Sequence, residues 1–138
     1  MLVAFGSDER CPTSEFVLKC LMKQYDVDVL AHGEHWIEVG FRLGRFVSSY
    51  PDSFGVGLCW TGTGVSIAAN KVKGARAALC FDSETAHGAR KWNNANILAM
   101  SIRQVGYGTC EEIIETFFAS MPDPDQLNEL NRLDIVTN

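Results

Sequence analysis

The sequence predicts an α/β fold in three layers, with a five-stranded parallel sheet between helices. The first observation is that short apolar runs alternate with amphipathic stretches along all 138 residues. The second is the order, a strand followed by a helix five times, which favours parallel strands joined by crossovers that cover both faces of the sheet. No linker, repeat or low-complexity segment interrupts this order. We therefore expect one domain spanning residues 1–138.

The expected strands are short apolar runs that end at glycine or at polar residues, as strands buried on both faces do. In chain order they are residues 2–5, 27–31, 56–60, 76–81 and 96–102. Gly6 closes the first run, and His32 with Gly33 closes the second. A Tyr-Pro-Asp-Ser turn at 50–53 precedes the third.

The expected helices have apolar side chains at helical spacing or are rich in alanine. In chain order they are residues 13–25, 36–47, 66–72, 83–91, 110–120 and 126–133. Thr13 or Ser14 can cap the first helix, since Pro12 stands just before it. Gly74 suits a left-handed end to the third. The last helix is too polar for a core element, so it is free to reach a partner subunit.

Charge and composition narrow the classes of partner. Hydrophobic residues make up 46% of the chain and charged residues 21%, which is ordinary for a globular protein. The formal net charge of -5, without a Lys/Arg cluster, argues against nucleic acid and anionic membranes. The first residues turn polar too soon for a signal peptide, and no apolar run approaches a membrane span. We expect a cytoplasmic protein that binds a small molecule.

The five cysteines are odd in number and irregularly spaced, and no Cys-x-x-Cys pair occurs. This pattern indicates neither a disulfide framework nor a zinc site, so we expect no metal and no cofactor. Cys59 differs from the others because it stands where an apolar run meets a glycine-rich turn. The other four are expected to be packing or surface residues: Cys11, Cys20, Cys80 and Cys110.

Polar residues follow the predicted strands, where a parallel α/β sheet binds its ligands. They are Asp8, Glu9 and Arg10, then His32, Glu34 and His35, then residues 59–66, Asp82 and Arg103. Because the carboxyl ends of parallel strands share one edge, we expect a binding site there.

The stretch 59–66 offers specific chemistry. Gly62 and Gly64 allow a tight turn that exposes backbone N–H groups, and Ser66 can cap the next helix, whose positive end faces the same space. An oxyanion forming near Cys59 would meet several fixed donors, and the helix N-terminus favours a thiolate there. Two plainer interpretations stay open, a turn without a ligand and a cysteine that is a small buried hydrophobe.

Three stretches resemble the type B ribose-5-phosphate and galactose-6-phosphate isomerases. They are Cys59-x-Thr61-Gly62-x-Gly64-x-Ser66-Ile67-Ala68-Ala69-Asn70-Lys71, Gly74-x-Arg76-Ala77-Ala78-Leu79-Cys80 and Ala89-Arg90-x-x-Asn93-x-Ala95-Asn96-Ile97-Leu98-Ala99. Gly6-Ser7-Asp8 fits as well. The resemblance implies a Rossmann-like α/β/α sandwich and homodimers or tetramers with active sites between subunits. It also implies an aldose–ketose isomerase that works through an enediolate.

The resemblance further implies a role for each site residue. Cys59 would be the base that moves a proton between C1 and C2, and Thr61 would assist ring opening or orient a hydroxyl. The amides of 62–66 would hold the enediolate oxygen, and Asp8 would bind sugar hydroxyls. Asn93 would come from the neighbouring subunit. The substrate-binding set is Asp8, Glu9, Gly62, Thr63, Gly64, Ser66, Trp92, Asn93, Arg103 and Arg132.

This chain departs from the family pattern at several positions. Glu9 replaces a phosphate-binding histidine, Trp92 replaces the ring-opening histidine, and Trp60 replaces a glycine. Some relatives have a glutamate base where Val65 stands, which leaves Cys59 as the candidate of the two. Near the carboxyl terminus, Arg132 matches one phosphate-binding arginine, whereas Asn128 occupies the other position.

These departures leave the substrate open. Glu9 would repel a desolvated phosphate by several kcal/mol, so the substrate lacks a phosphate there or carries it elsewhere. The missing histidine suggests a substrate that needs no ring opening, such as a tetrose or an open-chain ketose. Alternatively, Trp92 stacks on a sugar face or packs at a subunit interface. His35 is a candidate for the missing acid, although a lone histidine is usually structural.

The first choice of function is therefore an aldose–ketose isomerase with an altered substrate. One alternative is a subunit of a heteromeric isomerase, because the galactose-6-phosphate branch divides its catalytic residues between two chains. The other is a sugar-binding protein that kept the fold and lost turnover. Cys59, Thr61, Asp8 and Asn93 together argue against that last alternative.

Overall fold

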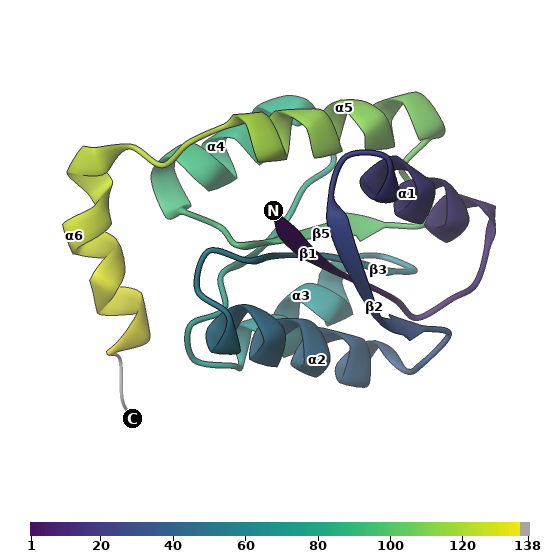
Figure 1. Cartoon of the computed structure of the whole chain (residues 1–138), viewed down its shortest axis with the longest axis horizontal. Helices are drawn as coiled ribbons and strands as arrows, with labels where there is room; N and C mark the ends of the chain where they lie inside the picture. The colour runs from purple at the N-terminus through teal and green to yellow at the C-terminus, as the bar shows by residue number, and fades with distance from the viewer. Residues whose placement is uncertain (136–138) are drawn as a thin grey trace.

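The computed structural model describes residues 1–135 and shows a parallel sheet between two layers of helices (Figure 1). The last three residues of the expected domain lie outside the described part. The strands are β1 (Leu2–Ser7), β2 (Asp26–His32), β3 (Phe54–Cys59), β4 (Ala77–Leu79) and β5 (Ile97–Ser101). Their order in the sheet is β2-β1-β3-β5-β4, and every neighbouring pair is parallel. The predicted fold class is confirmed.

Helices cover both faces of the sheet. They are α1 (Pro12–Met22), α2 (Trp36–Ser49), α3 (Thr63–Asn70), α4 (Ser83–Asn93) and α5 (Tyr107–Ala119), whereas α6 (Leu127–Leu130) lies at one end of the molecule. Helices α1, α4 and α5 form one layer, and α2 and α3 form the other (Figure 1).

Two apolar clusters fill the spaces between the sheet and its helical layers. Val3 and Phe5 belong to the cluster under α1 and α5, whereas Ala4, between them in β1, belongs to the cluster under α2 and α3. This alternation follows from the two-residue period of a strand. Because both faces are covered, the strands are continuous apolar runs rather than alternating ones.

Helix α1 begins earlier than predicted, and neither Thr13 nor Ser14 is its cap. The cap residue is Cys11, and Pro12 occupies the first helical turn. The Ser14 hydroxyl reaches back, accepting from Cys11 N and donating to Cys11 O, each at 3.0 Å. Ser14, the third residue of the helix, thus satisfies backbone groups of the cap residue with its hydroxyl.

Helix α3 also begins earlier, at Thr63 rather than Ser66, so Ser66 is not its cap. The cap is Gly62, in the left-handed conformation with φ of 77°. A β-carbon at Gly62 would lie 2.4 Å from Leu79 Cδ1, so both backbone and space require glycine. The start of the helix is therefore fixed next to the end of β3.

The strand expected at 76–81 shortens to three residues at the open edge of the sheet. The Asn70 side chain pairs with this edge, donating to Ala77 O at 2.9 Å and accepting from Ala77 N at 2.8 Å. An amide side chain thereby occupies backbone groups that would otherwise be free to pair with another strand.

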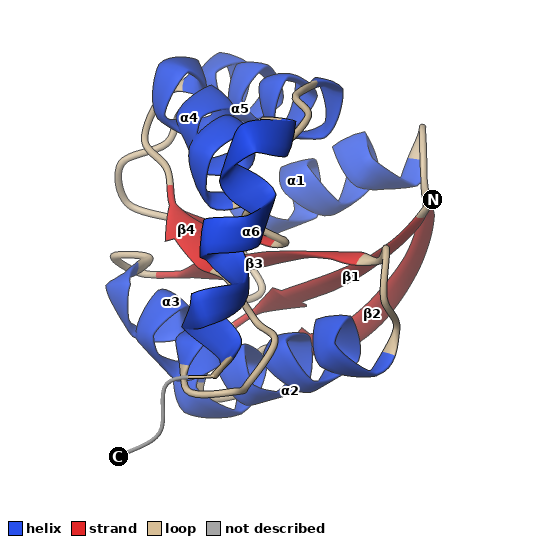
Figure 2. Ribbon diagram, turned by 90° about the vertical axis from the view of Figure 1, so that its left-hand side faces the viewer, coloured by secondary structure: helices blue, strands red, loops and turns tan. Residues whose placement is uncertain are grey.

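The expected terminal helix is divided into three short pieces. Helix α6 lies between two 3-10 segments, Pro124–Gln126 and Asn131–Asp134. Figures 1 and 2 show α6 at one end of the molecule, running from the layer of α4 and α5 toward the layer of α2 and α3. The terminal segment therefore spans the two helical layers of its own chain.

Candidate active site

The strand register brings the predicted site to one edge of the sheet. Ser7 at the end of β1 lies opposite Leu58, and Cys59 at the end of β3 lies opposite Ser101. Beyond these pairs, Asp8 N donates to Leu58 O at 3.1 Å, and Arg103 N donates to Trp60 O at 3.2 Å. Asp8, the glycine-rich loop and Arg103 are thus neighbours at the carboxyl edge of the strands, as predicted.

Cys59 is buried, at only 3% exposure in the single chain. Its side chain belongs to the apolar cluster under α2 and α3, with Ala4, Val39 and Val65. Most of the Cys59 side chain is therefore packed against apolar neighbours, as in the interpretation of Cys59 as a small buried hydrophobe. What sets it apart from Cys80 and Cys110 is its position beside the first turn of α3.

The first turn of α3 presents backbone donors next to Cys59. Ser66 N donates to Gly62 O at 3.3 Å and is the first amide of the helix with an intrahelical acceptor. The amides of Thr63, Gly64 and Val65 precede it and have no acceptor within the helix. The anion cradle predicted over 62–66 therefore consists of the amides before Ser66, at the positive end of the helix.

Gly64 is covered by an aromatic ring. A β-carbon there would lie 2.8 Å from Trp36 Cδ2 and Cε3, in the first turn of α2. The Trp36 ring therefore covers the loop, because the missing side chain at Gly64 leaves room for it. Beside it, the hydroxyls of Thr61 and Thr63 bond to each other at 2.7 Å and are exposed.

Asp8 stands out electrostatically. Its Oδ1 is buried and has no hydrogen-bond partner among the described residues. Burial raises the pKa of this carboxyl, and the neighbouring Glu9 raises it further. Hydrogen bonds to the backbone at Asp8 and Trp60 and the charge of His35 act in the opposite direction. An unsatisfied carboxylate oxygen at this edge is a ready acceptor for a ligand hydroxyl.

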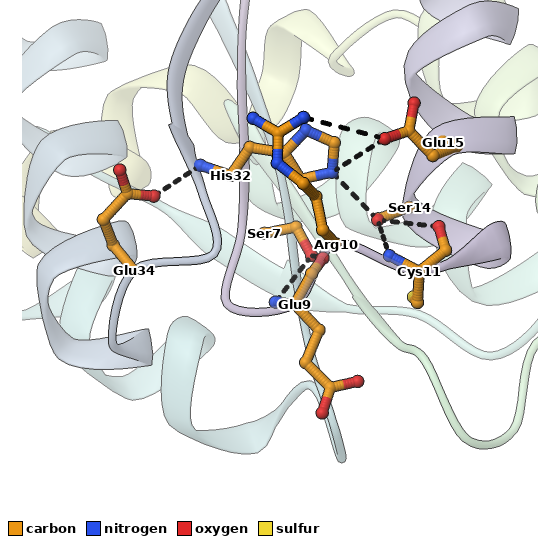
Figure 3. Close-up of polar contacts among 8 residues, drawn as sticks. All are labelled: Ser7, Glu9, Arg10, Cys11, Ser14, Glu15, His32 and Glu34. Carbon is orange, nitrogen blue, oxygen red and sulfur yellow. Dashed lines mark hydrogen bonds and ion pairs between the residues drawn. The ribbon is translucent and has the colours of Figure 1, made fainter.

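The loop that carries Asp8 and Glu9 is held by a network that sequence reasoning missed (Figure 3). His32, at the end of β2, is 4% exposed in its side chain; its Nε2 lies 3.0 Å from Ser14 Oγ and 3.8 Å from Glu15 Oε1. Ser7 Oγ donates to Glu9 O at 2.8 Å. His32 is therefore a structural residue, and the Glu9 side chain points away from the network (Figure 3).

His35 also has a structural role, as the cap of α2. Its Nδ1 accepts from Ile37 N at 3.2 Å. His87 is exposed, and its Nδ1 lies 2.9 Å from Ser120 Oγ.

Trp92, Asn93 and Arg132 are not brought to the carboxyl edge. Helix α4 begins just after β4 and runs for 11 residues, about 16 Å at 1.5 Å per residue, so Trp92 and Asn93 lie toward the opposite edge. Arg132 belongs to a segment anchored near Gly74, just before β4. Within one chain these three residues cannot join Cys59.

Trp92 nevertheless has the features of a binding surface. Its indole is 55% exposed and lies against Gly88, where a β-carbon would be 2.8 Å from Cζ3. With Asn93, Leu79 and Asp82 it lines a groove of about 490 Å³ along α4. Arg132 is 76% exposed in its side chain and donates to Glu129 Oε2 at 3.0 Å.

Two features are absent from residues 1–135. No helix there has the length and apolar character to cross a membrane. No group of three or more His, Cys, Asp or Glu side chains is placed there to hold a metal ion.

Comparison with known proteins gives the family. A family model described as Ribose/Galactose Isomerase matches residues 3–135. The chain belongs to the Ribose/Galactose Isomerase family. It is 34% identical over 135 residues to the LacB subunit of galactose-6-phosphate isomerase from Clostridium acetobutylicum, covering 94% of this chain and 78% of that protein. It is also 38% identical over 90 residues to a D-erythrulose-4-phosphate isomerase from Pectobacterium atrosepticum, covering 65% of this chain and 59% of that one.

Solved structures of the Ribose/Galactose Isomerase family agree with the fold. A ribose 5-phosphate isomerase from Thermotoga maritima superposes with a TM-score of 0.90 at 31% identity, covering 98% of both chains. Ribose-5-phosphate isomerase B from Mycoplasma genitalium, solved with bound ribulose-5-phosphate, gives a TM-score of 0.84 at 28% identity, covering 96% of this chain and 93% of that one.

Proposed function

We propose that this protein is an aldose–ketose isomerase that acts on a small sugar phosphate or sugar through an enediolate, with Cys59 as the base. The observation that carries the proposal is the position of Cys59 at the end of β3, beside the free amides of α3. The family match over residues 3–135 supports the reaction class.

The proposed reaction needs no oxidant or cofactor. The Cys59 thiolate takes the proton from C2 of the open-chain aldose, and the C–H electron pair forms the C1–C2 double bond. The C1 carbonyl oxygen becomes the enediolate oxygen, which the amides of Thr63–Val65 stabilise. A proton then passes from the C2 hydroxyl to the C1 oxygen, and the thiol returns its proton to C1.

The remaining residues bind and orient the substrate in this proposal. Asp8 accepts from sugar hydroxyls, because its buried Oδ1 has no partner in the described chain. Thr61 orients a hydroxyl with the help of its bond to Thr63. Arg103 supplies positive charge at the same edge.

Trp92, Asn93 and Arg132 act in trans, from a neighbouring subunit. Their position away from Cys59 is the reason, since one chain cannot bring the two groups together. Exposed aromatic side chains next to both groups of site residues support an interface: Trp60 follows Cys59, Phe81 follows β4, Trp92 precedes Asn93, and each is 45–55% exposed. We therefore propose a homodimer or tetramer with shared sites.

Two departures from the family pattern, Glu9 and Trp92, indicate the class of substrate. Glu9 disfavours a phosphate at the end of β1, so the phosphate binds elsewhere, beside Arg103 or the neighbour's Arg132, or is missing. Trp92 offers an apolar ring face and no acid–base group, which favours a tetrose or an open-chain ketose. The match to a D-erythrulose-4-phosphate isomerase supports the tetrose.

The substrate test is a panel of tetroses, pentoses and hexoses, each with and without a phosphate. We expect the highest kcat/KM with a four-carbon sugar phosphate. Equal or better turnover of D-ribose 5-phosphate would contradict the tetrose assignment.

The shared site is tested by mixing two inactive variants. Cys59→Ala and Asn93→Ala are each expected to lose activity as pure proteins. After subunit exchange, random pairing leaves about a quarter of the sites with both residues, so about a quarter of the activity should return. No recovery after confirmed exchange would contradict the shared site, because Asn93 and Cys59 of one chain would then be needed together.

A second candidate is one subunit of a heteromeric isomerase. The match to a LacB subunit favours it, together with tryptophan at the position of the family histidine. Activity that appears only after a related chain is added would support this candidate, and turnover by the purified chain alone would exclude it.

A further inference from the structure

Arg76 lies at the centre of a polar network at the edge of the sheet opposite to the glycine-rich loop. Its Nε donates to Asn94 O at 2.8 Å, and its backbone N–H donates to Asn96 Oδ1 at 2.7 Å. Asn96 Nδ2 donates in turn to Gly74 O at 2.9 Å. These bonds join the segment before β4 to the segment that follows Asn93 at the end of α4.

Asp134 attaches the carboxyl-terminal segment to this network. Its Oδ1 accepts from Gly74 N at 3.1 Å, and its Oδ2 lies 3.8 Å from Arg76 Nη1. The side chains are partly shielded, at 21% exposure for Arg76 and 36% for Asp134. In Figure 2, α6 and the segment after it cross the end of the sandwich in front of β4, so this anchor fixes the far end of that crossing.

Both ends of the network face one cavity. A cavity of about 610 Å³ is lined by Asn93 at the end of α4, by Arg76, and by Leu133 and Asp134. Arg132, two residues before Asp134, has an exposed side chain whose described partner is the equally exposed Glu129. The position of the Arg132 guanidinium therefore depends mainly on where the backbone of Asn131–Asp134 is held.

We propose that Arg76 and Asp134 are positioning residues, which hold the segment carrying Arg132 at a fixed place relative to Asn93. This inference rests on the proposed function, in which both residues enter the neighbouring subunit's site. A ligand-binding side chain gains most when its supporting contacts are fixed in advance. Asn93 and Arg132 lie 39 residues apart in the chain. Asp123 N donates to Lys91 O at 2.8 Å where the terminal segment begins, and the Arg76 network is the polar contact at the other end of that segment, beside Arg132.

The first experiment is steady-state kinetics of Asp134→Asn, with the sugar phosphate of the panel that gives the highest kcat/KM. The asparagine keeps an oxygen for Gly74 N but removes the charge that faces Arg76. We expect KM to rise about tenfold, with kcat within about twofold of wild type, because one charge-assisted contact that orders a binding side chain is lost. Asp125→Asn, in the same segment, removes an equal charge without touching Arg76 and should leave KM unchanged.

Making the same substitution in an Arg132→Gln protein separates a positioning role from a general loss of structure. If Asp134 acts through Arg132, Asp134→Asn should have no further effect on KM in an Arg132→Gln protein. Hydrogen exchange should also show faster exchange of the amides of 127–135 in Asp134→Asn, with the sheet amides unchanged.

The outcomes are distinguishable. A raised KM in Arg132→Gln with an unchanged KM in Asp134→Asn would overturn the positioning role and leave the proposed function intact. An unchanged KM in Arg132→Gln would remove Arg132 from the site, and the positioning role with it. Additive effects of the two substitutions would also contradict the inference.

Discussion

The indole of Trp92 lies over Gly88, one turn earlier on α4, so closely that a β-carbon at residue 88 would fall 2.8 Å from the ring. The other part of the indole is exposed. The absence of a side chain at Gly88 thus sets the orientation of an aromatic ring that we assign to substrate binding.

Gly88→Ala should therefore reduce activity without reducing stability. The added methyl group displaces a ring that is half exposed, while alanine is worth roughly 0.5–1 kcal/mol over glycine inside a helix. We expect the melting temperature to stay equal or rise, and kcat/KM to fall about tenfold. Calorimetry and steady-state kinetics measure the two quantities.

Gly108→Ala is the matched control for this prediction. Gly108 lies in α5, and no atom comes within 4 Å of a β-carbon built there. It should add a methyl group to a helix without moving any side chain, so kcat/KM should not change. If both alanine variants keep full activity, the orientation of Trp92 does not matter to the reaction.

Asp8→Asn should raise the stability of the fold at pH 7 and lower kcat/KM. Burial and Glu9 raise the pKa of the Asp8 carboxyl above its ordinary value of 3.8, so the charged form is unfavourable in the folded state. The free energy of unfolding of the wild type should fall as pH rises through this pKa. The free energy of unfolding of Asp8→Asn should not fall in this way, because asparagine does not titrate. The variant should then be more stable than wild type at pH 7 and equal to it below pH 4, measured by denaturant unfolding.

The activity of Asp8→Asn should change in the opposite direction. Hydrogen bonds to a charged acceptor contribute about 1.5–3 kcal/mol, so kcat/KM should fall about 10- to 100-fold. A variant that is both less stable at pH 7 and fully active would contradict the assignment of Asp8 as an unsatisfied acceptor in the site.

Cys80 and Cys110 should make the fold sensitive to alkali. Burial raises the pKa of each thiol from 9.0 to about 12. Between these values the unfolded chain loses the proton and the folded chain keeps it, so the free energy of unfolding should fall by roughly 1 kcal/mol per pH unit for each thiol. Denaturant titrations at pH 8, 9, 10 and 11 measure this slope.

The double variant Cys80→Ala/Cys110→Ala provides the comparison. It is expected to be less stable than wild type at pH 8, because two packed side chains are cut back, but to lose less stability between pH 9 and pH 11. Parallel curves for the two proteins would show that these thiols do not cause the alkaline loss.

Much of the fold was predictable because it depends on local patterns. Five apolar runs bounded by glycine or polar residues gave five parallel strands, and their carboxyl ends brought Asp8 and the glycine-rich loop together as expected. The element ends were less predictable. Gly62 rather than Ser66 caps α3, because a left-handed glycine fitted against Leu79 depends on a tertiary contact.

The geometry around the predicted site residues was only partly predictable. The burial of Cys59 depends on how α2 and α3 close over the sheet, which no local pattern reveals. The contact between His32 and Ser14 joins residues 18 positions apart, so periodicity gave no signal for it. The distance of Asn93 from Cys59 follows from the length of α4, which runs away from the carboxyl edge.

The central claim is that the Cys59 sulfur transfers the substrate proton, and solvent exchange measures this directly. The protein is incubated in heavy water with the sugar phosphate of the panel that gives the highest kcat/KM, and deuterium incorporation at C2 of the aldose is followed by NMR. Thermal unfolding confirms that Cys59→Ala is folded.

We expect wild-type protein to exchange the C2 hydrogen and folded Cys59→Ala to lose this exchange by at least about a thousandfold, as for removal of an essential base. Exchange by Cys59→Ala at a rate near that of the wild type would contradict the account, because another group would then be moving the proton.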